Sequence, residues 1–302
     1  MLNEGNFGSS NASLDHWSAE GVLTQKIYLS ANQAPPGDVL QSMFIEGDSV
    51  GWMVVNNSGK VDRLRLSDMT LTGSISGLTS PRFALRWDDL LFVTDLFSGQ
   101  ISVIDASSLE VIKVIDAGFW TEELILVNER IYTTAVDGDE LIEIDPISQA
   151  ISRRITVGRE PLDLAYAQDR IWVLCSGGFS EEEPTLHQID PVTGDTDTVL
   201  TIGEIADYPG ELVVNPGSGD ALFWLQNGVQ RLELSSLEQS LAIPANGRNL
   251  YGLGANPYRG TLVISDAKDF ISRGTVFQYS TNGILLDSII SGIIPGNFAV
   301  LP

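Results

Sequence analysis

The stretch 157–175, VGREPLDLAYAQDRIWVLC, contains the repeating unit that decides the fold. It starts with Gly-x-x-Pro, continues through an apolar strand and a polar turn, and ends in a strand centred on an aromatic residue. The same order recurs at 77–95 (GLTSPRFALRWDDLLFVTD) and at 118–134 (GFWTEELILVNERIYTT), so that Pro81, Thr121 and Pro161 are spaced 40 residues apart. A repeat of about this length with four short strands per unit predicts a β-propeller.

The repeat extends along almost the whole chain. At ~42 residues per unit, the 302 residues form seven blades in a single domain, 1–302. The first 34 residues supply only three strand-like pieces, at 2–7, 12–18 and 22–29, and 293–302 (IIPGNFAVLP) matches the first strand of the other repeats. We therefore expect the C-terminal strand to pair with the N-terminal strands and close the ring. No segment has sustained 3.6-residue periodicity, so we expect an all-β fold without helices.

The charge of the chain restricts its partners. With 40 acidic and 17 basic residues the net charge is −23, and such a field repels phosphate backbones, which argues against nucleic-acid binding. Two interpretations of the acidity stay open: a solvated surface, as in a salt-adapted protein, or a surface that attracts a cationic partner. No apolar stretch approaches the ~20 residues of a transmembrane helix, so we expect no membrane span.

The sequence contains little that supports a catalytic function. His16 and His187 are the only histidines and lie in different repeats, so neither a His-based zinc site nor a Ser-His-Asp triad has a supporting motif. Cys175 lies in an apolar strand, where a buried inert thiol is expected. We predict no catalytic residue and no required cofactor. Glu122–Glu123 and Asp137–Asp139 could supply oxygens to a structural Ca²⁺ ion, although DGDE indicates first a hairpin turn.

One face of the ring is the predicted binding site. In a propeller, the loops leading into the innermost strands and the loops between second and third strands converge on one rim, which forms the default pocket. Aromatic, amide, carboxylate and Arg side chains in these loops suit a large, polar, partly aromatic ligand. The alternative for each residue is a wedge between sheets or a solvated loop. The predicted binding residues are Asn6, Arg82, Phe97, Trp120, Glu122, Arg159, Glu160, Asp163, Phe179, Tyr208, Arg248, Tyr251, Asp266, Phe270 and Asn297.

Several strings together resemble a known family. They are LNEGNFGSSNASL at 2–14, VTDLFSGQISVID at 93–105, YGLGANP at 251–257, SDAKDF at 265–270 and SGIIPGNF at 291–298. The chain resembles the YncE-like (YVTN-repeat) seven-bladed propeller lipoproteins of Bacteroidota, among which are the cobalamin-binding BtuG proteins. The resemblance spans residues 2–298, and its terminal motifs are more specific than the propeller repeat itself.

The resemblance implies a non-catalytic protein that captures a corrinoid and passes it to a TonB-dependent outer-membrane transporter. It also implies a lipid-anchored place at the cell surface of the outer membrane, or an extracellular one; the leader and the anchoring cysteine are absent from this sequence. Two alternatives stay open. One is a metal-dependent hydrolytic propeller of the lactonase type, and the other is a scaffold that binds a protein or glycan through its acidic face.

Overall fold

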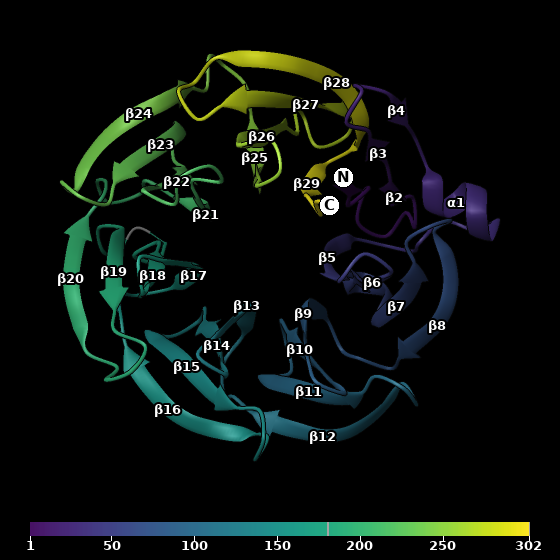
Figure 1. Cartoon of the computed structure of the whole chain (residues 1–302), viewed down its shortest axis with the longest axis horizontal. Coiled ribbons are helices and arrows are strands. Elements are labelled where there is room, and N and C mark those ends of the chain that lie inside the picture. Colours follow the sequence, from purple (N-terminus) through teal and green to yellow (C-terminus); the bar gives the residue numbers. More distant parts are fainter. Residues whose placement is uncertain (180, 302) are drawn as a thin grey trace.

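Seven blades stand around a central channel in the computed structural model, which describes residues 1–179 and 181–301 (Figure 1). Blades 2 to 7, numbered in chain order, are four-stranded antiparallel sheets. Blade 1 consists of a three-stranded and a two-stranded sheet contributed by both ends of the chain. The predicted all-β seven-bladed propeller is therefore confirmed.

The strands of each blade follow one another from the channel outward. The innermost strands are β29 (Pro295–Asn297), β5 (Leu40–Glu46), β9 (Pro81–Trp87), β13 (Thr121–Val127), β17 (Pro161–Ala167), β21 (Gly210–Val214) and β25 (Leu250–Asn256). The second strands are β1 (Leu2–Asn3), β6 (Val50–Val55), β10 (Leu90–Asp95), β14 (Arg130–Ala135), β18 (Arg170–Cys175), β22 (Ala221–Leu225) and β26 (Thr261–Asp266).

The outer half of each blade is built in the same way. The third strands are β2 (Ser13–Leu14) with β3 (His16–Trp17), β7 (Lys60–Arg65), β11 (Gln100–Asp105), β15 (Glu140–Asp145), β19 (Thr185–Ile189), β23 (Gly228–Glu233) and β27 (Arg273–Ser280). The outermost strands are β4 (Leu23–Thr24), β8 (Thr70–Ser76), β12 (Glu110–Asp116), β16 (Ala150–Thr156), β20 (Thr196–Thr201), β24 (Glu238–Pro244) and β28 (Leu285–Ile293).

A buried aromatic residue at the same strand position in four consecutive blades explains the 40-residue period. Trp52, Phe92, Tyr132 and Trp172 occupy the third position of the second strand in four consecutive blades and are almost fully buried. Each packs with aliphatic side chains of the following blade; Trp172, for example, belongs to a cluster with Leu222 of β22. These clusters lie between blades, so each repeat is stabilised mainly by its neighbours.

Blade 1 joins the two ends of the chain. β29 pairs with β1 in antiparallel register, with Leu2 opposite Asn297 and Asn3 opposite Pro295. The buried amide of Asn3 donates to Ser13 O at 3.2 Å, and its Oδ1 accepts hydrogen bonds from Ser291 Oγ at 2.9 Å and Gly292 N at 3.0 Å. One side chain therefore links β1, β2 and β28. Pro302, at the end of the predicted closing segment, lies outside the described residues.

The expectation of no helix is wrong at one place. The strand-like piece predicted over 22–29 is only β4, and the chain then forms α1 (Ile27–Asn32). Tertiary contacts hold this helix, because Tyr28 is buried and its hydroxyl lies 3.1 Å from Asp62 Oδ2, while Asn32 Oδ1 accepts from Leu71 N at 2.8 Å. Six residues are too few to show a helical period in sequence. A 3₁₀ turn, η1 (Asn56–Ser58), follows β6. Among the described residues no helix has the length and apolarity needed to cross a membrane.

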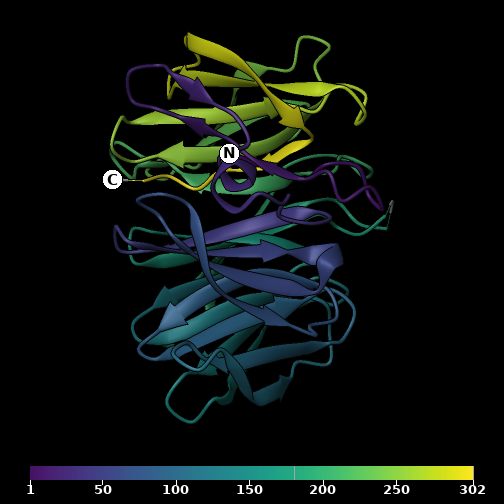
Figure 2. The ribbon, with the colours of Figure 1, turned by 90° about the vertical axis from the view of Figure 1, so that its right-hand side faces the viewer.

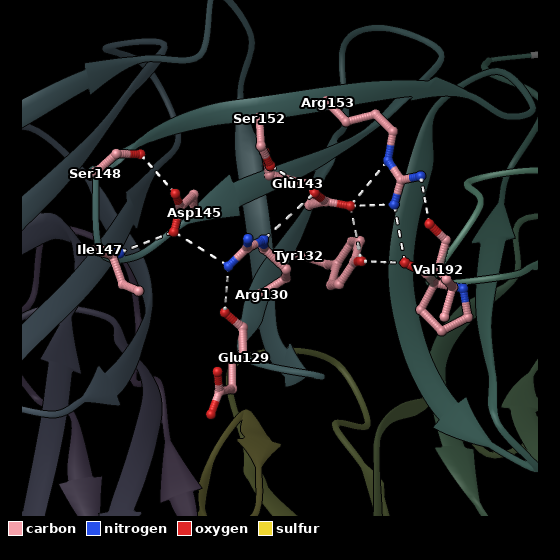
Figure 3. A network of polar contacts seen from close by, with 11 residues as sticks. Glu129, Arg130, Tyr132, Glu143, Asp145, Ile147, Ser148, Ser152, Arg153 and Val192 are labelled. Atoms are coloured by element: carbon pink, nitrogen blue, oxygen red, sulfur yellow. Dashed lines mark hydrogen bonds and ion pairs between the residues drawn. The ribbon is translucent and has the colours of Figure 1, made fainter.

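A polar network ties blade 4 to blade 5 (Figure 3). The buried Tyr132 hydroxyl lies 2.9 Å from Glu143 Oε2 and 3.1 Å from Pro191 O, a carbonyl of the next blade. Ser152 Oγ donates to Glu143 Oε1 at 2.6 Å, and Arg153 donates to both Glu143 and Pro191 O. Burial, together with the Glu143 carboxylate, raises the pKa of Tyr132 to about 12. The network gives the phenol and carboxylate partners that their burial requires.

Changing Tyr132 to Phe should lower the free energy of unfolding by about 1–2 kcal/mol, because Glu143 and Pro191 O lose a donor in a buried setting. Urea titration followed by tryptophan fluorescence measures this. The matched control is Tyr258→Phe, at an exposed hydroxyl, which should stay within about 0.5 kcal/mol of the wild type. Equal effects of the two changes would contradict the structural role of the network.

Candidate functional site

The same β-bulge occurs at the channel mouth in every blade. In β5, Leu40 pairs with Val55 and Ser42 with Val54, so that Gln41 is an extra residue without a partner in the ladder. Each other innermost strand has a register shift at the same point. A bulge redirects a side chain and recurs next to functional sites. The residues at this position of the seven innermost strands, which surround the channel in Figure 1, are Gln41, Arg82, Glu122, Leu162, Glu211, Tyr251 and Gly296.

Arg82 connects three of these positions. Its Nε lies 2.7 and 2.9 Å from the two carboxylate oxygens of Glu122 in the next blade, and its Nη1 donates to Gln41 Oε1 in the preceding blade. Trp120 Nε1 also donates to Glu122, at 2.6 Å from Oε1. Burial nevertheless raises the pKa of Glu122, against the opposing effect of Arg82. The pair is therefore a desolvated ion pair at the centre of the ring.

Further carboxyl groups crowd the same channel mouth. Burial raises the pKa of Glu123 well above its usual range, and the charge of Asp163 and a hydrogen bond with it raise that pKa further. Burial also raises the pKa of Glu211, followed by the charges of Asp163 and Glu4. Asp163 itself accepts hydrogen bonds from Leu164 N and Leu212 N, both at 2.6 Å. The raised pKa favours the neutral form of both carboxyl groups, and a neutral carboxyl can donate a hydrogen bond as well as accept one.

Tyr251 completes the ring beside Glu4. Its hydroxyl donates to Glu4 Oε1 at 2.9 Å, and burial with the Glu4 charge raises the tyrosine pKa. The Tyr251 ring contacts Phe270 edge-on at 5.4 Å between centroids. Asn6 Nδ2 donates to Phe270 O at 2.9 Å. The structure thus brings together three of the predicted residues, Asn6, Tyr251 and Phe270, from blades 1 and 7.

Aromatic side chains stand on the rim around this polar mouth. Phe7, Phe97 and Phe179 lie in the loops between second and third strands of blades 1, 3 and 5, with 78%, 77% and 83% of their surface exposed. Phe179 stacks on Tyr208, with ring centroids 5.6 Å apart. Arg159 beside them pairs with Glu181 at 3.2 Å. The rim therefore offers apolar faces above an acidic channel mouth.

Other predicted residues have structural partners. Arg248 packs over the Phe277 ring at 4.9 Å, and its guanidinium donates to Tyr279 and to backbone carbonyls. Glu160, with a φ of 53°, accepts from Ser176 Oγ. Asp266 Oδ1 accepts from Asn249 N and Lys268 N, which shapes a loop. Asn297 Oδ1 accepts from the adjacent Phe298 N.

Four residues of the ring, Gln41, Leu162, Glu211 and Gly296, are not among the predicted binding residues, and Glu211 is the ionisable one. It lies 49 residues after Leu162, whereas Arg82, Glu122 and Leu162 are spaced 40 apart, so the period no longer marks its place. The structure supplies a second signal, because Glu211 has a φ of 54°. Non-glycine residues in this region carry backbone strain that is concentrated at functional sites.

In the described part of the chain, no group of three or more His, Cys, Asp or Glu side chains is arranged to hold a metal ion. The predicted structural Ca²⁺ ion and the lactonase-type alternative, which requires a divalent metal, stay predictions. Cys175 is buried, and burial raises the pKa of its thiol to about 12, which is typical of an inert side chain.

Comparison with known proteins gives the fold alone. No protein-family model and no curated protein matches the chain. Among solved structures, the chain is similar to hydrazine synthase from Kuenenia stuttgartiensis (TM-score 0.65, 16% identity, 84% of this chain and 87% of that chain). It is similar to a chain of the mitotic checkpoint complex (TM-score 0.66, 11% identity, 86% and 82%) and to BamB from Moraxella catarrhalis (TM-score 0.62, 17% identity, 90% and 80%). All three support the propeller architecture.

Glu211→Gln should stabilise the protein at pH 8 by roughly 1 kcal/mol or more, and the gain should shrink toward pH 5. A carboxyl whose pKa is raised by folding contributes most stability below its unfolded pKa and loses that contribution as the pH rises. The neutral amide of the variant does not titrate, so only the wild type loses this contribution to stability as the pH rises. Urea unfolding at both pH values measures the difference.

The control is Glu238→Gln, at an exposed position on an outermost strand, which should change the unfolding free energy by less than about 0.5 kcal/mol at either pH. A stabilisation by Glu211→Gln that is equal at pH 5 and pH 8 would contradict the assigned titration.

Proposed function

We propose that this protein is a non-catalytic binding propeller that takes a large, partly apolar ligand on the rim, above the acidic channel mouth. The observation that carries the proposal is the exposure of Phe7, Phe97 and Phe179 on loops of one face. Exposed aromatic side chains gathered around a polar centre mark interaction sites, because water solvates them poorly.

A corrinoid is the ligand that we propose first. Its macrocycle is a broad, nearly flat surface that can lie against aromatic rings. Its amide side chains can donate hydrogen bonds to carboxylates. Glu4, Glu122 and Glu211 supply such acceptors below the rim, while Arg82 supplies a donor for ligand carbonyls. This combination of apolar faces with a few oriented polar groups is typical of small-molecule sites. The resemblance to cobalamin-binding propellers supports the same choice.

The proposed biological setting follows from that resemblance. A propeller of this kind at the surface of the outer membrane, or outside the cell, would hold the corrinoid until a TonB-dependent transporter accepts it. The net charge of −23 would keep such a protein soluble and direct it toward cationic surfaces of a partner.

Isothermal titration of the protein with cobalamin and cobinamide tests the proposal. We expect saturable binding, and we expect Phe97→Ala and Phe179→Ala each to weaken it by roughly 5- to 30-fold, as removal of a central aromatic contact does. The matched control is Ile147→Ala, at an equally exposed apolar residue in the turn between β15 and β16, which should not change the affinity.

Absence of heat and of any change in the visible absorption band at micromolar protein would reject the corrinoid. Retained corrinoid binding by both phenylalanine variants would reject the rim as its site.

A further inference from the structure

A cavity of about 270 Å³ lies in blade 1, away from the rim. Its walls include the turn between the first and second strands of blade 7, at Tyr258, and the turn between the third and fourth strands of blade 2, at Met69. These turns are at the opposite ends of the strands from the rim loops, so the cavity belongs to the other face of the ring. Figure 2 shows the C-terminal segment, which also lines the cavity, ending at one face of the disc.

The short strands of blade 1 explain why this space exists. β1, β2, β3 and β4 have two residues each, whereas the corresponding strands of the other blades have five to nine. The neighbouring blades therefore flank a sheet that is too small to fill the gap between them. Residues 298–301 cross part of the opening without forming a strand.

One part of the lining is apolar. Leu14 of blade 1, Met43 and Ile45 of β5, Leu66 after β7 and Val263 of β26 line the cavity from three blades. Its volume is near the lower end of the roughly 300–1,000 Å³ found for small-molecule sites. Methionine and branched aliphatic side chains adapt well to a flexible hydrocarbon chain.

The charged and polar part of the lining favours an anion. Its ionisable side chains are Asp15, His16 and Arg259, and the two Asp15 oxygens lie 2.8 Å from Lys26 N and 3.1 Å from Ser291 Oγ. Arg259 brings a permanent positive charge to the cavity wall, and one of its guanidinium nitrogens donates to Ala19 O. The other N–H donors of the guanidinium can bind a carboxylate through charge-assisted hydrogen bonds.

We propose that this cavity binds an aliphatic carboxylate, with its hydrocarbon chain against the apolar wall. Its carboxylate lies at the guanidinium of Arg259. A neutral alcohol offers no charge to Arg259, and an alkylammonium offers neither an acceptor nor an attractive charge. The site is independent of the corrinoid proposal, because it lies on the other face and uses other residues.

Calorimetric titration of the folded protein with decanoate, decanol and decyltrimethylammonium tests the proposal. We expect saturable binding of decanoate, weaker binding of decanol and none of the cation. Octanoate should bind on the order of tenfold more weakly than decanoate, because two fewer CH₂ groups are buried. No binding of decanoate, or equally tight binding of decanol or of the cation, would overturn the proposal.

Variants identify the site. Arg259→Gln should weaken decanoate binding by about tenfold and leave decanol unchanged, since it removes a charge-assisted contact. Glu20 lies within electrostatic reach of Arg259 and His16, so Glu20→Gln should tighten decanoate binding. The matched control is Lys113→Gln on β12, which removes one positive charge in blade 3 and should change nothing.

Filling the cavity gives a test that does not depend on charge. Val263→Trp on β26 and Ala299→Trp in the C-terminal segment each place a large ring in the space from a different side, and each should abolish decanoate binding. Thermal unfolding of both variants shows whether they fold. A folded variant that binds decanoate as tightly as the wild type would exclude the cavity as the site.

Discussion

The antiparallel pairing of β29 with β1 is the interaction on which the rest of the ring depends. Seven blades packed side by side enclose a channel only if the last innermost strand meets the first part of the chain, because otherwise two sheet edges remain open. The buried Asn3 amide reinforces this contact by joining β1, β2 and the end of β28. Closure is achieved with very short strands, and the cavity in blade 1 is a direct result.

The channel mouth combines a regular backbone with irregular electrostatics. Repeated bulges place one residue of every blade at the same level, and Arg82 offsets part of the charge of the carboxyl groups there. Burial raises the pKa of Glu122 and Glu211 in spite of this cation. A buried excess of carboxyl groups opposes folding, so its presence indicates that the mouth has a task other than stability.

The period of the sequence was enough for the architecture but not for the site. Pro81, Thr121 and Pro161 mark equivalent strand starts, because each blade packs on the next through the same buried aromatic position. The helix α1 escaped prediction because contacts with β7 and β8, distant in sequence, stabilise it. Arg248 has the residue type and loop position predicted for a ligand contact, yet its guanidinium binds Tyr279 in blade 7 and carbonyl groups at the end of blade 6. Only side-chain direction distinguishes the two roles, and spacing does not encode direction.

The bulge at the channel mouth places the variable side chains of the ring apart from the packed clusters that hold the blades together. An amide, a guanidinium, carboxylates, an aliphatic chain, a phenol and a glycine occupy the same backbone position, while the aromatic clusters between blades keep their packing. Substitutions at these seven places can therefore be combined without repacking a core. The ring is in this respect a seven-position template for receptors of altered selectivity, in which Gln41, Arg82 and Glu122 are exchanged together because Arg82 binds both of the others.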